Sequence, residues 1–295
     1  MSRHSAICRQ RLRGTLKRLR QEADLSIEEV ASGLSSSVAA IVDLESGRRL
    51  PDIDEVNALL RAYGEPVPES AQVRAYLEAV SAHRWSDFDD IAGAPVQQFL
   101  ELASTAATIR VFQCSTVPGF LQTPAYTRAL MREAFGREET IADRFVRLRE
   151  DYRRAVLDVT DTAPPRLVVV LDEAVLQRAV GGPEVMRAQL KSLSAAAQRP
   201  DVTMRVLGFE VGGTAGVDGS FTHLELPQSV GDDALYLETP QGQQLYQGGE
   251  SVVGRSLGAF AALEAKAPAE RTGDRLAAAL AVFSPPPDTD GGPQP

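Results

Sequence analysis

The chain has few of the residues that build metal centres and disulfide frameworks. Its 295 residues include two cysteines and three histidines, and Cys8 and Cys114 are too far apart for a zinc-site or redox-pair spacing. No run of about 18 apolar residues is present, which argues against a membrane helix, and the first residues lack the apolar segment of a secretory signal peptide. We therefore expect a cytoplasmic protein with reduced thiols, no metal, no cofactor and no membrane segment.

A general excess of positive charge is also missing. The net charge is −9, which disfavours attachment to polyphosphate over the whole surface. The distribution is uneven, because the first 20 residues contain seven basic side chains and no acidic one. A surface for nucleic acid would therefore lie on the first helix and on the two arginines within residues 45–52.

Residues 8–64 show the apolar spacing of a small helical domain. Leu16 and Leu19 recur on one face of the first expected helix, and Ser26 with Glu29 forms the pattern of a capping box before the next one. Two helices joined by a short turn inside a domain of this size indicate a helix-turn-helix.

The second of these helices, within residues 37–45, has Ile41 and Leu44 as its expected buried pair. A further helix should follow and stop at Gly64, because glycine commonly occupies the left-handed position just past a helix end.

The rest of the chain reads as an α+β domain in which helices lead into a mainly antiparallel sheet. The glycine-rich segment 208–220 lacks the Lys-Ser/Thr of a phosphate loop, and we expect a hairpin loop there. The predicted helices are 70–83, 94–110, 124–134, 138–158, 183–200, 250–264 and 270–283, with strands in "RLVVVLD", "VTMRVLGF", "GSFTHLEL" and "ALYLET". The expected divisions are an all-α helix-turn-helix domain (1–64), a helical connector (65–110), an α+β ligand or partner domain (111–283) and a disordered tail (284–295).

Six motifs carry a resemblance to a known family: "LKRLRQEADLSIEEVA", "LESGRRLPD", "VPGFLQTPAYTRAL", "LDEAVLQRAVGGPEVMRAQLKSL", "GSFTHLEL" and "YLET". Together they resemble a bacterial family, common in actinobacteria, that joins an XRE-type helix-turn-helix to a C-terminal domain of antitoxin-like regulators. The resemblance covers about residues 10–283. It implies a cytoplasmic DNA-binding transcriptional regulator, usually dimeric and often paired with a small partner protein, whose C-terminal domain binds that partner or a signal.

The expected recognition helix departs from this resemblance. Family members typically carry polar and basic side chains along it, whereas the outward positions here are Ala39, Ala40, Val42 and Asp43. Reading bases needs donors or acceptors at the groove edges, and alanine and valine offer only apolar contact with a thymine methyl group. Asp43 can accept from a cytosine amine, but a carboxylate near phosphates costs on the order of 1 kcal/mol or more. Contacts that position DNA remain, while most contacts that specify its sequence are lost.

The motif "VPGFLQTPAY" has two interpretations. Thr123 as the N-cap and Pro124 at the first helical position would fix a chain reversal. Alternatively, Gln122, Tyr126 and Arg128 would line a pocket or a partner-binding wall.

Four further polar residues are candidates for the same pocket. Asp172 or Glu173 can cap a helix start, or Glu173 can act as a general acid or base at the mouth of a cavity. His223 lies on an expected strand, where the usual role is a surface or hydrogen-bonded histidine. Tyr236 and Glu238, on the strand "ALYLET", complete the set.

Two functions remain open from the sequence. The first is a DNA-binding regulator with weak or altered readout. It should be retained on duplex DNA in a salt-dependent way that weakens when Arg48 and Arg49 become alanine. Its candidate contacts are Arg11, Lys17, Arg18, Ser36, Ser37, Ala40, Asp43, Arg48 and Arg49.

The second function is that of a repurposed family member that no longer binds DNA. Such a protein would bind or transform a small molecule without a cofactor, for example as a cyclase in secondary metabolism, and its helix-turn-helix would serve dimerisation. This function predicts an enclosed cavity with converging polar groups within residues 95–250. Whether the chain is an enzyme therefore stays open at this point.

Overall fold

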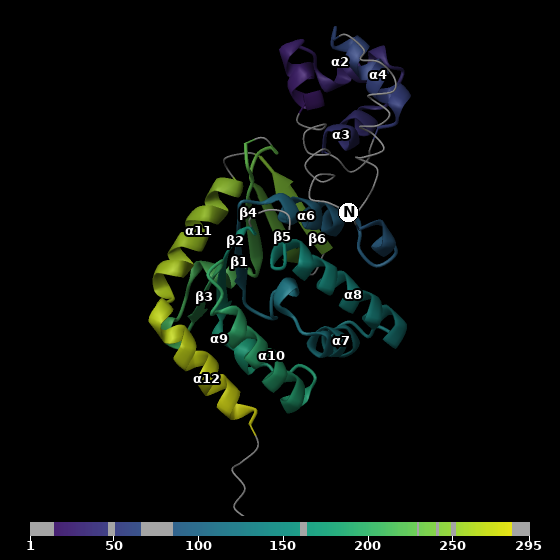
Figure 1. The fold of residues 1–295 in the computed structure, drawn as a ribbon. Coiled ribbons are helices and arrows are strands. Elements are labelled where there is room, and N and C mark those ends of the chain that lie inside the picture. The colour runs from purple at the N-terminus through teal and green to yellow at the C-terminus, as the bar shows by residue number, and fades with distance from the viewer. Residues whose placement is uncertain are drawn as a thin grey trace, which may run out of the picture. The chain divides into compact units, whose positions relative to one another are not determined.

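A computed structural model describes residues 15–46, 51–65, 85–159, 164–228, 230–239, 242–248 and 252–284 (Figure 1). A helix that includes residues 15–22 comes first. The later α-helices are α2 Ile27–Gly33, α3 Val38–Ser46, α4 Ile53–Ala62, α6 Ala94–Thr105, α7 Pro124–Glu133, α8 Glu139–Val156, α9 Glu173–Gln177, α10 Gly182–Ala196, α11 Val253–Lys266 and α12 Thr272–Val282. The strands are β1 Thr108–Gln113, β2 Arg166–Asp172, β3 Val202–Leu207, β4 Phe221–Glu225, β5 Ala234–Thr239 and β6 Gly242–Gln247. Short 3-10 turns are η1 Ser86–Phe88, η2 Gly119–Leu121, η3 Phe209–Val211, η4 Ala215–Asp218 and η5 Ala269–Arg271.

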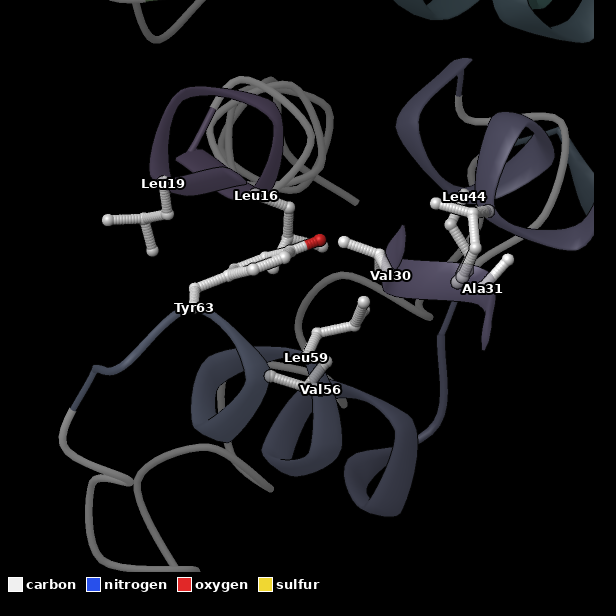
Figure 2. Close-up of a cluster of buried hydrophobic side chains, with 9 residues drawn as sticks. Leu16, Leu19, Val30, Ala31, Leu44, Val56, Leu59 and Tyr63 are labelled. Carbon is white, nitrogen blue, oxygen red and sulfur yellow. The ribbon is translucent and has the colours of Figure 1, made fainter. Parts of the chain in front are cut away.

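The N-terminal helices enclose one small apolar core. Side chains from the first helix and from α2, α3 and α4 meet there, as Figure 2 shows. The cluster consists of Leu16, Leu19, Val30, Ala31, Ile41, Leu44, Val56, Leu59 and Tyr63. The helical spacing that singled out Leu16, Leu19, Ile41 and Leu44 in the sequence is confirmed. Burial of such side chains is worth about 1.5–3 kcal/mol each, which is what holds helices this short together.

Side chains close the ends of these helices. Ser26 and Glu29 form the expected capping box at α2, and Asp52 with Glu55 forms a second one at α4. Gly64, with φ of +77°, ends α4 and lets the following backbone bond back to the last turn. Both features agree with the sequence, because capping depends on neighbouring residues only.

The six strands form one mixed sheet in the order β3-β2-β1-β4-β5-β6. Strands β2 and β3 run parallel, with Leu167 opposite Val202, and α9 and α10 make the crossover that a parallel pair needs. Strands β5 and β6 are antiparallel neighbours. The expected fold class is confirmed: short N-terminal helices are followed by an α+β part whose sheet is mostly antiparallel.

The helix predicted over residues 94–110 was too long. The structure ends α6 at Thr105, and residues 108–113 form β1. Ser104 and Thr105 donate their hydroxyls to carbonyls three residues earlier, so these side chains satisfy acceptors of the final turn. Strand β1 is buried on both faces although it mixes apolar and polar residues, and so short a segment has no period that separates strand from helix.

Two other expectations are corrected by the sheet. Segment 208–220 is not a hairpin loop, because β2 and β1 lie between β3 and β4 in the strand order. Strand β6 was not predicted at all. It pairs at the sheet edge with β5 and is mostly exposed, so its polar sequence carries no apolar alternation.

Each of two compact units combines distant segments of the chain. One contains residues 1–109, 155–165 and 222–256, and the other contains residues 110–154, 166–221 and 257–295. The boundaries expected at residues 64, 110 and 283 remain predictions. The helix expected over residues 70–83 and the tail from residue 285 lie outside the described residues. No helix in the described part of the chain combines the length and apolarity that a bilayer crossing needs.

Candidate nucleic-acid interface and the polar clusters that follow it

Helix α3 has a buried side and an outward side. Ile41 and Leu44 are 2% and 3% exposed and lie in the core. Val38, at the start of the helix, is 42% exposed, and Ala39 is exposed as well. Two candidate DNA contacts, Ala40 and Asp43, are partly buried, as is Val42. The side of α3 away from the core therefore presents mainly methyl groups.

Three serines precede α3 and all are exposed, among them the candidate contacts Ser36 and Ser37. The hydroxyl of Ser37 accepts a hydrogen bond from the backbone N–H of Ala40 at 3.1 Å, which makes Ser37 the cap of the helix. Ser36 lies one residue earlier, after Ser35 with its left-handed φ of +51°. Both hydroxyls lie at a helix N-terminus, where backbone N–H groups favour anions such as phosphate.

The basic candidates of the first helix lie on its surface. Lys17 is exposed, and Arg18 pairs with Glu22 at 2.7 Å across one helical turn. An exposed pair of this kind contributes about 0.3–0.5 kcal/mol, so a phosphate can displace Glu22 at little cost. Arg11, Arg48 and Arg49 lie outside the described residues.

Arg20 is not part of this surface. Its guanidinium makes two hydrogen bonds to the Glu45 carboxylate, at 2.6 and 3.0 Å, and a third to the Leu25 carbonyl at 2.7 Å. The two charged side chains are only 11% and 8% exposed. This ion pair ties the end of α3 to the first helix, and the bond to Glu45 raises the pKa of Arg20. One of the seven basic residues near the N-terminus is therefore structural.

Tyr63 brings a polar group into the same core. Its hydroxyl is buried and has no hydrogen-bond partner among the described residues. Figure 2 shows the ring lying across the cluster with the oxygen toward Val30. Burial raises the pKa of Tyr63 to about 12, because the charged phenolate would lose its hydration there.

The motif "VPGFLQTPAY" forms a chain reversal whose side chains satisfy its own backbone. Gln122 donates to the Val117 carbonyl at 2.7 Å, and the Tyr126 hydroxyl accepts from the Val117 N–H at 3.2 Å. Thr123 caps α7 and Pro124 occupies its first turn, as expected. Burial raises the pKa of Tyr126. Gln122 and Tyr126, predicted as a pocket wall, are thus buried and both bind the backbone of Val117.

A glutamine of α10 holds the same loop from outside the motif. Gln189 is 0% exposed. Its amide donates to the Leu121 carbonyl at 2.8 Å and accepts from the Thr123 N–H at 2.7 Å. Both sides of the side-chain amide are therefore committed to the backbone.

Arg128, the third candidate of the motif, lies on α7 and faces α8. Its guanidinium reaches Asp143 at 2.6 Å and Glu139 at 3.3 Å. The Arg128 side chain is 37% exposed. It therefore links two helices at the surface.

Glu173 lies in an ion-pair cluster. Asp172 caps α9 by accepting from the Ala174 N–H at 2.9 Å. Glu173 accepts from Arg275 at 2.8 Å and from the Phe209 N–H at 3.1 Å, and Arg275 also pairs with Glu210. This geometry suits a structural anchor of segment 208–220 better than a general acid.

His223 is the most enclosed of the candidates, at 1% exposed. Its Nδ1 lies 3.1 Å from the Ser256 hydroxyl, and its Nε2 lies 3.2 Å from the Asp233 carboxylate. Asp233 also accepts from the Leu226 N–H at 3.0 Å. The expected hydrogen-bonded histidine is confirmed, and its partners come from the loop after β4 and from α11.

The two candidates on β5 differ in exposure. Tyr236 is buried and stacks on Phe99 of α6, with ring centroids 4.1 Å apart. Glu238 is exposed and lies opposite Gln243 in the β5–β6 register. Glu238 is thus a surface carboxylate near the end of β5, the strand next to the sheet edge.

Comparison with known protein families divides the chain in two. A family model for a helix-turn-helix domain matches residues 11–73. A second model, for a domain of unknown function named DUF5753, matches residues 96–277, more than half of the chain. The chain belongs to the DUF5753 family. No curated protein and no solved structure gave a significant match.

The DUF5753 domain contains all the pocket candidates, and the helix-turn-helix domain contains the DNA candidates. In the DUF5753 domain, sequence reasoning missed Gln189, Asp233, Ser256 and Arg275. Each of them contacts a residue from ten to 102 positions away. In the helix-turn-helix domain it missed the ion pair of Arg20 with Glu45. Complementary charge was the only signal for that pair, and many acids near Arg20 offer it equally.

Proposed function

We propose that this DUF5753 protein is a DNA-binding transcriptional regulator whose recognition helix has lost most hydrogen-bonding readout of bases. One observation carries the proposal. Within a matched helix-turn-helix domain, α3 keeps Ile41 and Leu44 in the core while Val38 and Ala39 are exposed. A recognition helix must present such an outward side to the major groove.

The surrounding polar groups suit phosphate contacts. Ser36 and Ser37 lie at the start of α3, and Lys17 and Arg18 are exposed on the first helix. Contacts of this kind set the position of a protein on DNA and carry no sequence information. The resulting binding would be salt-dependent and weakly selective.

The finer assignment follows the family resemblance. We place the chain among XRE-type, antitoxin-like regulators that act in the cytoplasm as homodimers. The DUF5753 domain would then bind a small partner protein or a small ligand. The loop around Gln122 and Tyr126 would offer a rigid surface to such a partner, because these side chains hydrogen-bond to its backbone and hold its conformation.

A second candidate function rests on His223, which lies between a carboxylate and a hydroxyl. That array can move a proton, so a member without DNA binding would use it in cofactor-free chemistry such as a cyclisation. At 1% exposure, the imidazole requires a fully enclosed substrate. The experiment below separates the two functions.

The experiment is a fluorescence anisotropy titration of the full chain on a mixed-sequence duplex. We expect binding at about 50 mM salt that weakens steeply toward about 200 mM, since each phosphate contact adds about −0.9 to the log–log salt slope. Lys17→Ala should weaken binding and flatten that slope by about one contact. Lys191→Ala is the matched control, because it removes the same charge from an exposed site on α10 of the DUF5753 domain. No binding at about 50 mM salt would contradict the regulator function and leave the second candidate.

A further inference from the structure

The outward side of α3 presents mainly apolar side chains. Val38 is 42% exposed and Ala39 is exposed, and Val42 is partly exposed beyond them. None of these three side chains carries a donor or an acceptor. The exposed Ser36 and Ser37 lie before the helix, next to its capped N-terminus, and Asp43 on the helix itself is partly buried.

Only one standard DNA base presents a matching group in the major groove. Thymine carries a C5-methyl group there, whereas guanine, adenine and cytosine present only acceptors or amine donors. An apolar side chain gains by contact with that methyl group and gains nothing from a polar edge. Lys17 and Arg18, exposed on the same domain, are complementary in charge to the phosphates beside the groove.

We propose that α3 reads thymine methyl groups, with Val38 and Ala39 as the side chains that contact them. This inference rests on the proposed function. It adds that α3, although it lacks hydrogen-bonding readout, prefers sequences that contain thymine. The preferred duplexes would present closely spaced thymines in the major groove. Guanine and cytosine would bind less tightly because they offer no methyl group there. Each methyl group contacted should change affinity about fourfold, the factor for burying one methylene-sized group.

The test compares two duplexes that differ only in this methyl group. One is a 24-base-pair duplex of alternating adenine and thymine, and the other has deoxyuridine in place of every thymine. We expect the full chain to bind the thymine duplex at least about fourfold more tightly at about 50 mM salt, since uracil lacks only the C5-methyl group. A third duplex, with 5-methylcytosine in place of cytosine in a mixed sequence, should regain part of the difference.

Variants locate the effect on the protein. Val38→Ser and Ala39→Ser should each bring the thymine-to-uracil affinity ratio toward one, while leaving affinity for the uracil duplex unchanged. Both positions are exposed, so the unfolding of the helix-turn-helix should not move. Val282→Ser is the control, because Val282 is 71% exposed at the end of α12 in the other domain.

The outcomes separate this inference from the proposed function. Equal binding to both duplexes overturns the methyl readout and leaves DNA binding standing. Binding to neither duplex overturns both. A change of oligomeric state in Val38→Ser, measured by sedimentation without any DNA binding, would show that a second protein surface covers this side of α3 and would also overturn the inference.

Discussion

In the helix-turn-helix domain, the polar side chains singled out by the sequence are mostly exposed, whereas in the DUF5753 domain they are mostly bonded within the protein. Lys17 and Ser36 face solvent, while Gln122 and Tyr126 bind the backbone C=O and N–H of Val117 respectively. An exposed polar side chain can meet an external partner without loss of internal bonds. A buried one that pairs with backbone cannot do so without exposing an unsatisfied group. The comparison therefore supports the proposal that the first domain contacts DNA, and it assigns loop anchoring to the polar residues of the second.

The largest expected effect comes from the buried ion pair of Arg20 with Glu45 in the first domain. Glu45→Ala leaves the Arg20 guanidinium buried without its partner, which should lower the unfolding free energy of the helix-turn-helix by about 3–5 kcal/mol. Urea unfolding followed by hydrogen exchange in residues 15–65 measures it. Glu22→Ala breaks only the exposed pair with Arg18 and should change stability by less than about 0.5 kcal/mol. Equal effects of the two variants would show that the buried ion pair stabilises the domain no more than the exposed one does.

Alkaline pH should destabilise the same core through Tyr63. The pKa of this phenol is about 12 in the folded domain and about 10 when unfolded. The contribution of Tyr63 to the unfolding free energy is therefore complete below pH 10. It is lost as the pH rises toward 12, which lowers the unfolding free energy by roughly 3 kcal/mol.

Tyr63→Phe is the variant that isolates this contribution. It should remove this part of the pH dependence and raise stability at neutral pH by about 1 kcal/mol, because no hydroxyl is then buried without a partner. The measurement is urea unfolding at pH 8, 10 and 11 for both proteins. Parallel pH profiles would mean that the phenol of Tyr63 reaches water.

In the DUF5753 domain, Gln189 is the residue whose loss should matter most. Gln189→Leu keeps the volume and removes both bonds to the loop, so the Leu121 carbonyl and the Thr123 N–H lose their partners. We expect a loss of about 2 kcal/mol and faster hydrogen exchange in residues 117–127. Lys191→Leu, on an exposed site of the same helix, should leave both unchanged. Unchanged exchange in the Gln189 variant would contradict the anchoring role.

The smallest expected effect concerns the affinity of the first domain for DNA. Glu22→Gln releases Arg18 and removes a charge that repels phosphate, so affinity for a mixed-sequence duplex should rise about twofold, the equivalent of roughly 0.4 kcal/mol. Anisotropy at about 50 mM salt is the readout. Glu184→Gln removes an exposed acid from the other domain and should have no effect. A rise in both variants would reflect net charge alone.

Local sequence was enough to predict the helix-turn-helix. Helical spacing identified Leu16, Ile41 and Leu44 as core residues, and the capping box at Ser26 and the stop at Gly64 agree with the structure. These features depend on residues within one or two turns of each other, where periodicity and capping chemistry act directly.

The candidate pocket residues were harder to interpret, because their roles depend on distant partners. Tyr126 could have faced a cavity, yet its hydroxyl meets Val117. The predicted helix 94–110 ran into strand β1, because a short segment buried on both faces has no period that separates strand from helix. Gln189 gave no signal at all, since a glutamine on a helix is usually solvated and only the loop packed against it makes it buried.

The central claim, that this protein meets DNA through the helix-turn-helix and not through the DUF5753 domain, is tested most directly by hydrogen exchange of the full chain with and without duplex DNA at about 50 mM salt. We predict slower exchange in residues 26–46, which include α2 and α3, and unchanged exchange in residues 96–277. Protection confined to residues 96–277, or no protection anywhere at that salt concentration, would contradict the account.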